Sequence, residues 1–189
     1  MRVVAGKFRS RSLASMPGMD IRPTSDKLRE TLFNVLCAGN RDALAGQTFL
    51  DLFAGTGAVG IEALSRGAGK VVFVESSAKA VVLIRENLES LGVAEGYSIQ
   101  RSDVTAALRK MANAGLVADV VFLDPPYAGQ TLYQGTLEAL ALWSGVNEET
   151  AVIAEHDQRF DPGESVGALQ RRRLLRQGDA ALSFYRKIT

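Results

Sequence analysis

The sequence is poor in the residues that build disulfides and metal sites. Its 189 residues contain one cysteine, Cys37, and one histidine, His156. A single thiol cannot form an internal disulfide or a thiolate metal cluster, and a lone imidazole does not make a metal site. We therefore expect no bound metal, and we interpret Cys37 as a small core residue and His156 as a residue at the end of a strand.

The sequence also lacks long apolar runs. No stretch approaches the roughly 20 apolar residues that a membrane-spanning helix needs. At the start of the chain, basic residues interrupt what would have to be the apolar segment of a secretory signal; they are Arg2, Lys7, Arg9 and Arg11. We therefore expect a cytoplasmic protein without membrane contact.

What is present fits one globular domain. The chain is 47% hydrophobic and 23% charged, as is typical of soluble proteins, and its length suits one substantial core. No repeat or linker interrupts it. We predict a single, monomeric domain over residues 1–189, with residues 1–39 as a basic extension and first helix and residues 47–189 as the core.

The formal net charge of +1 conceals an uneven distribution. Residues 1–29 carry seven Lys and Arg against two Asp and Glu, residues 171–189 carry six against one, and the middle of the chain carries nine against eighteen. Basic ends on an acidic body suit a nucleic-acid backbone, although solvated terminal charges would give the same pattern. Charge alone leaves both interpretations open.

From Thr48 onward, short apolar segments alternate with amphipathic ones. Strands separated by helices predict a parallel sheet covered on both faces, which is a Rossmann-like α/β fold. Residues Leu169–Arg176 and Ala181–Ile188 then predict an antiparallel hairpin that turns at Gly178-Asp179. The predicted core strands are Thr48–Leu52, Val71–Glu75, Tyr97–Gln100, Asp119–Leu123 and Ala151–Glu155, and the predicted helices between them are Ala58–Ser65, Ala78–Leu91, Val104–Ala114 and Leu132–Trp143.

A glycine-rich loop follows the first predicted core strand. Gly55, Gly57 and Gly60 allow a tight turn and a close approach of the backbone to a ligand. Glu75, 20 residues after Gly55, ends the next strand, where a carboxylate can bind both hydroxyls of an adenosine ribose. NAD and S-adenosylmethionine both carry that ribose, so this motif does not separate them.

Asp51, near the end of the same strand, favours S-adenosylmethionine. Its carboxylate would repel the pyrophosphate of a dinucleotide but attract the cationic amino-acid and sulfonium groups of S-adenosylmethionine. Asp103, after the third strand, is placed to accept the adenine amino group, although a helix cap would explain it as well. The full set predicted to bind the cofactor is Asp51, Phe53, Ala54, Gly55, Gly57, Gly60, Glu75, Ser76, Asp103 and Asp124.

A second turn, Asp124-Pro125-Pro126-Tyr127, follows the apolar strand that ends at Leu123. An exocyclic base amine is a poor nucleophile because its lone pair is delocalised into the ring. The Asp124 carboxylate and the Pro125 carbonyl can hold its two N–H groups so that the freed lone pair points at a methyl group, while the prolines fix the backbone. Tyr127 offers a face on which the base can stack. We therefore predict catalytic roles for Asp124, Pro125, Pro126 and Tyr127.

Four blocks of the sequence form a recognisable set: Arg2–Phe8, Arg22–Asn34, Asp51–Gly60 with Glu62–Gly67, and Asp124–Tyr127. Together they resemble the bacterial 16S rRNA guanine-N2 methyltransferases. The second block is the discriminating one, because many methyltransferases share the glycine loop and all amino methylators share the Asp124 turn. The resemblance implies a class I methyltransferase fold with a seven-stranded sheet and an N-terminal extension, S-adenosylmethionine as cofactor, and the N2 amine of a guanosine in small-subunit RNA as acceptor.

Basic residues of the extension and the first helix are the candidates for RNA contact. A solvated helix face is an equally good interpretation for Lys27. Whether the RNA is free or part of an assembling small subunit stays open, as does the role of Arg171–Arg173. The predicted RNA-binding residues are Arg2, Lys7, Arg9, Arg11, Arg22, Thr24, Lys27 and Arg29.

Three alternatives remain at this point. A DNA adenine-N6 or cytosine-N4 methyltransferase would use the same two turns, but its target-recognition insert has no room in 189 residues. An NAD-linked oxidoreductase would share the glycine loop, but Asp51 and the Asp124 turn argue against it. A non-catalytic RNA-binding assembly factor would need only the basic ends.

Overall fold

The computed structural model describes residues 1–15, 25–126 and 129–188. In this part of the chain, five α-helices flank one eight-stranded sheet with the order β3-β2-β1-β4-β5-β8-β7-β6. The helices are α1 (Asp26–Leu36), α2 (Ala58–Ser65), α3 (Ala78–Ser90), α4 (Val104–Asn113) and α5 (Gln130–Leu142). The strands are β1 (Thr48–Leu52), β2 (Lys70–Glu75), β3 (Tyr97–Arg101), β4 (Val120–Leu123), β5 (Ala151–Asp157), β6 (Ser165–Val166), β7 (Leu169–Gln177) and β8 (Ala180–Lys187).

Strands β1 to β5 run parallel, so their carboxyl ends share one edge of the sheet. β1 lies between β2 and β4, and the direction in which the chain adds strands reverses there. Open α/β sheets bind their ligands at such a switch point. β8 runs antiparallel to both β5 and β7, which confirms the predicted hairpin and its turn at Gly178-Asp179.

The predicted α/β fold is confirmed, with one strand more than the seven expected. The extra strand is β6, which pairs with β7 through only two residues, Ser165 and Val166. A strand this short has no alternation of apolar and polar positions, so periodicity cannot reveal it.

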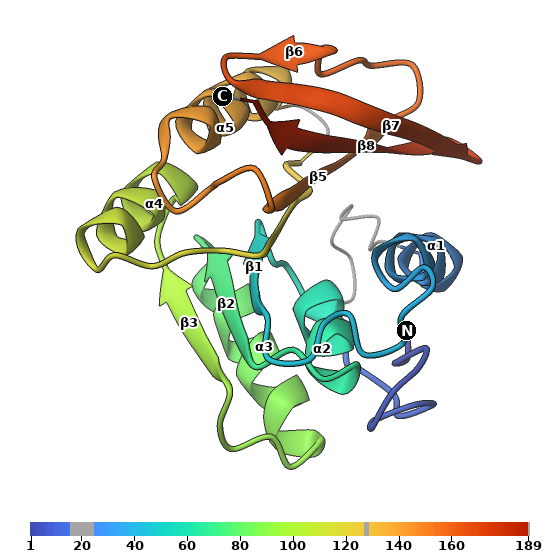
Figure 1. The fold of residues 1–189 in the computed structure, drawn as a ribbon. Coiled ribbons are helices and arrows are strands. Elements are labelled where there is room, and N and C mark those ends of the chain that lie inside the picture. The colour runs from blue at the N-terminus through green and yellow to red at the C-terminus, as the bar shows by residue number, and fades with distance from the viewer. Residues whose placement is uncertain (16–24, 127–128, 189) are drawn as a thin grey trace.

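Each face of the sheet has its own apolar core. Helices α1, α2 and α3 cover one face, where Phe49 and Phe73 are buried, and α4 and α5 cover the other, where Leu50 and Val72 are buried (Figure 1). Because successive strand residues point to opposite faces, strands covered on both sides must be apolar throughout. This is why the central strands β2 and β4 appear in the sequence as apolar segments, whereas the edge strand β3 is more polar.

The N-terminal extension folds back on itself and packs on α2. Val3 donates its backbone N–H to the carbonyl of Arg11 at 2.9 Å, which closes a short ribbon. Gly6, at a φ of 79°, approaches α2 so closely that an added Cβ would lie 1.9 Å from the Ser65 carbonyl oxygen. Only glycine fits this contact.

The single histidine and the single cysteine differ in part from their predicted places. β5 continues to Asp157, so His156 lies within the strand and is 2% exposed. Its ring nitrogens lie 2.9 Å from the Asp157 carbonyl and 2.9 Å from the Ser183 hydroxyl, and burial lowers the pKa of the ring. Cys37 follows α1 and packs against the core while only partly buried.

Candidate functional site

The glycine loop (residues 53–57), between β1 and α2, contains three residues with left-handed backbone. Phe53, Gly55 and Gly57 have φ values of 61°, 55° and 76°. This conformation is strained for a bulky residue such as Phe53, and such strain concentrates at ligand sites. The nearest described atom to a Cβ added at Gly55 would be the Phe53 carbonyl oxygen, 4.0 Å away. The backbone of Gly55 is therefore open to a ligand.

Glu75 holds the glycine loop from the end of β2. Its Oε2 accepts a hydrogen bond from the Gly55 N–H at 2.8 Å, and its Oε1 accepts one from the Ser77 N–H at 2.7 Å. The side chain is half-buried, and each carboxylate oxygen has a second lone pair for a further donor. The structure thus brings Glu75 to the loop, with acceptors suited to a pair of ribose hydroxyls.

Asp51 lies beneath the loop and is 2% exposed. Its Oδ2 accepts a hydrogen bond from the Gly60 N–H at 2.8 Å. Burial raises the pKa of the Asp51 carboxyl to about 8, the hydrogen bond from Gly60 opposes the shift, and the charge of Glu75 adds to it. A cation bound nearby would favour the ionised form.

Gly60 has a packing role that the sequence did not reveal. A Cβ at this position would lie 2.3 Å from Cε1 of Phe73, so α2 can approach β2 only because residue 60 has no side chain. Gly57 is less crowded, with Ile84 3.2 Å from an added Cβ. Of the three predicted glycines, Gly55 is the one with open space beside it.

The remaining predicted cofactor residues line the same edge of the sheet. Ala54 is buried in the loop and donates its N–H to the Val74 carbonyl at 3.0 Å. Ser76 is exposed just after β2. Asp103 follows β3 and caps α4, since its Oδ1 accepts the Ala106 N–H at 2.9 Å. The helix-cap interpretation of Asp103 therefore holds, and its side chain is also exposed at this edge.

The Asp124 turn (Asp124–Pro126) directly follows β4, next to β1. Leu123 pairs with Leu52 in register, so Asp124 and the glycine loop leave the sheet side by side. Burial raises the pKa of the Asp124 carboxyl well above its ordinary value, and the charges of Glu155 and Asp51 raise it further. The three carboxylates therefore belong to one electrostatic site, of which the sequence predicted two.

Two residues that the sequence analysis missed support this turn. The Tyr133 hydroxyl, on α5, donates to the Glu155 carbonyl at 2.8 Å and lies 3.4 Å from the Pro125 carbonyl. Glu155 is 4% exposed; an acid near the end of an otherwise apolar strand was its signal. No sequence signal marked Tyr133, because it resembles any core residue of a helix. Pro125 is buried and Pro126 exposed, whereas Tyr127 lies outside the described residues.

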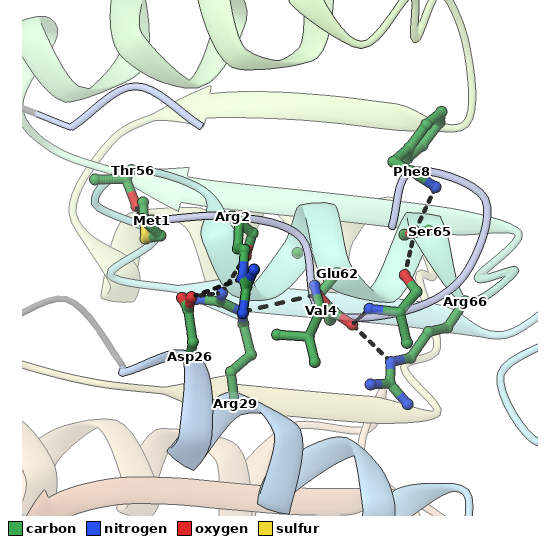
Figure 2. A network of polar contacts seen from close by, with 12 residues as sticks. Met1, Arg2, Val4, Phe8, Asp26, Arg29, Thr56, Glu62, Ser65 and Arg66 are labelled. Carbon is green, nitrogen blue, oxygen red and sulfur yellow. Dashed lines mark hydrogen bonds and ion pairs between the residues drawn. The ribbon is translucent and has the colours of Figure 1, made fainter. Parts of the chain in front are cut away.

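A buried carboxylate ties the N-terminal extension to α2 (Figure 2). Glu62 is fully buried and accepts the backbone N–H groups of Val4 at 2.7 Å and Ala5 at 2.9 Å. Arg66, one turn later, donates to the same carboxylate at 2.8 Å. Glu62 therefore fixes the extension against the helix that follows the glycine loop.

The structure corrects the role predicted for Arg29. Its side chain is fully buried and donates to the Arg2 carbonyl at 2.5 Å and to Asp26 at 2.8 Å. A guanidinium inside the protein cannot bind an RNA phosphate, so the prediction that Arg29 contacts RNA is wrong. The residues predicted to bind RNA that are exposed are Arg2, Lys7, Arg9, Arg11 and Lys27, while Arg22 and Thr24 lie outside the described residues.

Asn87 joins the extension to the glycine loop. This α3 residue is 1% exposed. Its Oδ1 accepts the Ala14 N–H at 2.7 Å, and its Nδ2 donates to the Ala14 carbonyl at 3.2 Å and to the Thr56 carbonyl at 3.1 Å. The extension and the loop consequently share one buried amide.

In residues 1–15, 25–126 and 129–188, no group of three or more His, Cys, Asp or Glu side chains is arranged to hold a metal ion. Within the same ranges, no helix is both long and apolar enough to cross a membrane.

The chain is similar to known proteins over almost its whole length. A family model described as "Conserved hypothetical protein 95" matches residues 1–186. The YlbH protein of Bacillus subtilis is 35% identical over 187 residues, which make up 99% of this chain and 99% of that protein. Ribosomal RNA small subunit methyltransferase D of Escherichia coli strain K12 is 31% identical over 157 residues, 83% of this chain and 75% of that protein.

Solved structures agree with these relatives. The yhhF protein of Escherichia coli has a TM-score of 0.81 and 29% identity, with 99% of this chain and 97% of that chain covered. The protein TTHA0928 of Thermus thermophilus has the same TM-score, 0.81, and 29% identity, with 97% of this chain and 98% of that chain covered.

Proposed function

The chain belongs to the family of ribosomal RNA small subunit methyltransferase D, with the class I methyltransferase fold, and we propose that it transfers a methyl group from S-adenosylmethionine to the exocyclic N2 amine of a guanosine in small-subunit rRNA. The observation that supports this most is the placement of the Asp124 turn beside the glycine loop at the carboxyl edge of β1 and β4. An acceptor and a methyl donor can meet there.

The residues at the glycine loop fit S-adenosylmethionine. Glu75 offers two carboxylate oxygens for the ribose hydroxyls, and Gly55 leaves its backbone open to the ligand. Burial raises the pKa of the Asp51 carboxyl and of the Asp124 carboxyl, and neighbouring carboxylates raise both further, so a cationic ligand would favour their ionised forms. Asp103 and Ser76 are exposed at the same edge for the adenine end.

S-adenosylmethionine supplies an electrophilic methyl group on a sulfonium. The Asp124 carboxylate and the Pro125 carbonyl accept the two N–H groups of the guanine amine, which withdraws the nitrogen lone pair from the ring and directs it outward. As the nitrogen takes up the methyl group it becomes cationic, and the Asp124 carboxylate stabilises that charge until a proton leaves. Pro125 and Pro126 hold the acceptors in place beforehand.

The RNA backbone is proposed to lie along the extension and α1. Arg2, Lys7, Arg9 and Lys27 expose cationic side chains there, and such groups fix a nucleic acid through its phosphates without reading its sequence. Binding should therefore weaken strongly as salt is added. A small-subunit rRNA partner also implies a cytoplasmic location.

Incubation with labelled S-adenosylmethionine and unmodified small-subunit particles, followed by mapping of the modified nucleoside, tests the proposal. We expect one N2-methylguanosine. Naked rRNA in a parallel reaction establishes whether the particle is required. Label in DNA alone would indicate a DNA methyltransferase, and RNA binding without transfer to any substrate would indicate an assembly factor.

A further inference from the structure

A cavity of about 290 Å³ lies beside Tyr133, the residue that contacts the Asp124 turn. It is at the end of β5 and the start of α5, and none of the described residues that line it was predicted from the sequence to belong to the site. Ligand pockets run from roughly 300 to 1,000 Å³, so this one suits a group of the size of a single base. The described residues that line it are Gln130, Tyr133, Asp157, Arg159 and Phe160.

The cavity shares a wall with the Asp124 turn. Tyr133 lines the cavity, and its hydroxyl reaches the Pro125 carbonyl at 3.4 Å and the Glu155 carbonyl at 2.8 Å. Asp124 and Pro125 are not among the described residues of its lining. A group in the cavity would therefore be a neighbour of the amine held at Asp124.

One side of the cavity is aromatic. The Phe160 ring lies 5.1 Å from the Tyr133 ring, centroid to centroid, at an interplanar angle of 50°. His156 meets Phe160 edge-on, with centroids 6.2 Å apart. These contacts fix the orientation of Phe160, which is only partly buried. Rigid aromatic faces of this kind stack nucleobases of any sequence.

The rim of the cavity is polar and carries a guanidinium. The Arg159 side chain is 83% exposed and binds Asp157 through Nε at 3.0 Å and Nη2 at 2.9 Å. This ion pair neutralises the carboxylate that would otherwise repel a phosphate. Gln130 adds an exposed amide, which can both donate to and accept from a base edge.

We propose that the cavity holds the base of a nucleotide next to the methylated guanosine in the same RNA strand, stacked on Phe160, with the intervening phosphate beside Arg159. The inference rests on the proposed function, because it requires an RNA strand whose target amine lies at Asp124. The cavity would hold the RNA strand at a second point, so that the target base enters the site in one orientation.

The test combines a protein variant with RNAs that each lack one base. Single abasic sites are introduced at each of the three nucleotides on either side of the methylated guanosine, and RNA affinity is measured for the wild type and for Phe160→Leu. In the wild type, we expect one of these sites to weaken binding by about 5-fold to 150-fold, the range of one stacked base. Phe160→Leu should bind intact RNA more weakly by a similar factor and show no further loss at that site.

The matched control is Tyr97→Leu, which removes a partly buried aromatic ring from β3 at the far edge of the sheet. It should keep wild-type affinity and the wild-type response to the abasic site. Phe160→Trp, which retains a stacking face, should restore binding if the ring itself is what matters.

The proposal is overturned if the loss of RNA affinity caused by Phe160→Leu multiplies with the loss caused by every abasic site, because the two changes would then act independently. It is also overturned if Phe160→Leu lowers kcat and leaves RNA affinity unchanged, since the cavity would then serve the target base. Failure of the proposed function is a different result, in which the wild type transfers no methyl group to any RNA.

Discussion

The guanidinium of Arg29 lies 3.8 Å from the carboxylate of Glu62, and neither side chain is exposed to solvent. Arg29 belongs to α1 and Glu62 to α2, and the backbone of the extension is bonded to both side chains. Two opposite charges in the interior therefore hold three segments together. Removing the Glu62 charge would leave the buried Arg29 guanidinium with Asp26 alone as its counter-charge, and Arg66 would lose its partner as well, which is more destabilising than losing a surface pair.

Glu62→Gln tests this arrangement. We expect the free energy of unfolding to fall by about 3–5 kcal/mol, the usual loss when one partner of a buried pair is removed. Urea denaturation followed by circular dichroism measures it. Glu89→Gln, on the exposed side of α3, is the control and should change stability by less than about 0.5 kcal/mol. Equal stability of the two variants would show that the buried pair contributes little.

Gly60→Ala tests the contact between α2 and β2. The added Cβ would lie 2.3 Å from the Phe73 ring, so we expect a loss of about 1–3 kcal/mol from overpacking. Gly135→Ala is a matched control, because Gly135 also lies within a helix, α5, but an added Cβ there meets nothing within 4 Å. That change should stabilise the protein by up to about 1 kcal/mol.

A second substitution separates crowding from any other effect of Gly60→Ala. Phe73→Leu shortens the side chain that the new Cβ meets, so the double variant should lose less stability than the sum of the two single variants. Thermal unfolding of the wild type, the two single variants and the double variant completes this double-mutant cycle. Strict additivity would contradict the packing role of Gly60.

Asp51→Asn should remove a pH dependence of stability. The Asp51 carboxyl has a pKa of about 8 in the folded protein and 3.8 as its ordinary value. Between these values the folded state binds one proton more than the unfolded state, so this group makes the free energy of unfolding fall as pH rises. The slope for one such group is at most about 1.4 kcal/mol per pH unit.

Urea unfolding between pH 5 and pH 10 checks this prediction. The wild type should lose stability relative to Asp51→Asn as pH rises, and the gap should stop widening above the folded-state pKa. Asparagine can still accept the Gly60 N–H, so the loop geometry is kept. Parallel stability curves for the two proteins would mean that Asp51 is ionised throughout this range.

Asp124→Asn should lower kcat by about 100-fold or more, because an amide cannot stabilise the positive charge that develops on the acceptor nitrogen. Binding of S-adenosylmethionine, measured by calorimetry, should change little. Asp42→Asn, at an exposed position between α1 and β1, should retain full activity. If Asp124→Asn lost cofactor binding and transfer to the same extent, its role would be structural.

Much of this architecture could be predicted from local signals. Asp51, Gly55 and Glu75 are marked by their positions at the ends of apolar strands, and parallel pairing brings strand ends together wherever the sheet forms. The Asp124 turn was found for the same reason. Residues at the ends of strands can be predicted from the sequence without knowing which elements pack on one another.

The missed residues depend on tertiary contacts. Arg29 was expected on the surface because a charged helix residue usually is, and only the packing of α1 against α2 places Glu62 opposite it. Phe160 and Tyr133 meet from segments without any shared pattern in the sequence. Such pairs are set by how helices and loops pack together, which periodicity does not encode.

The hydrogen bonds between the extension and the body of the protein also constrain the order in which the segments fold. Val4 is 58 residues from Glu62, and Ala14 is 73 residues from Asn87. The opening residues therefore leave the ribosome well before their partners exist, and they must wait for the middle of the chain to fold. The extension can thus reach its native position only after α2 and α3 have been synthesised.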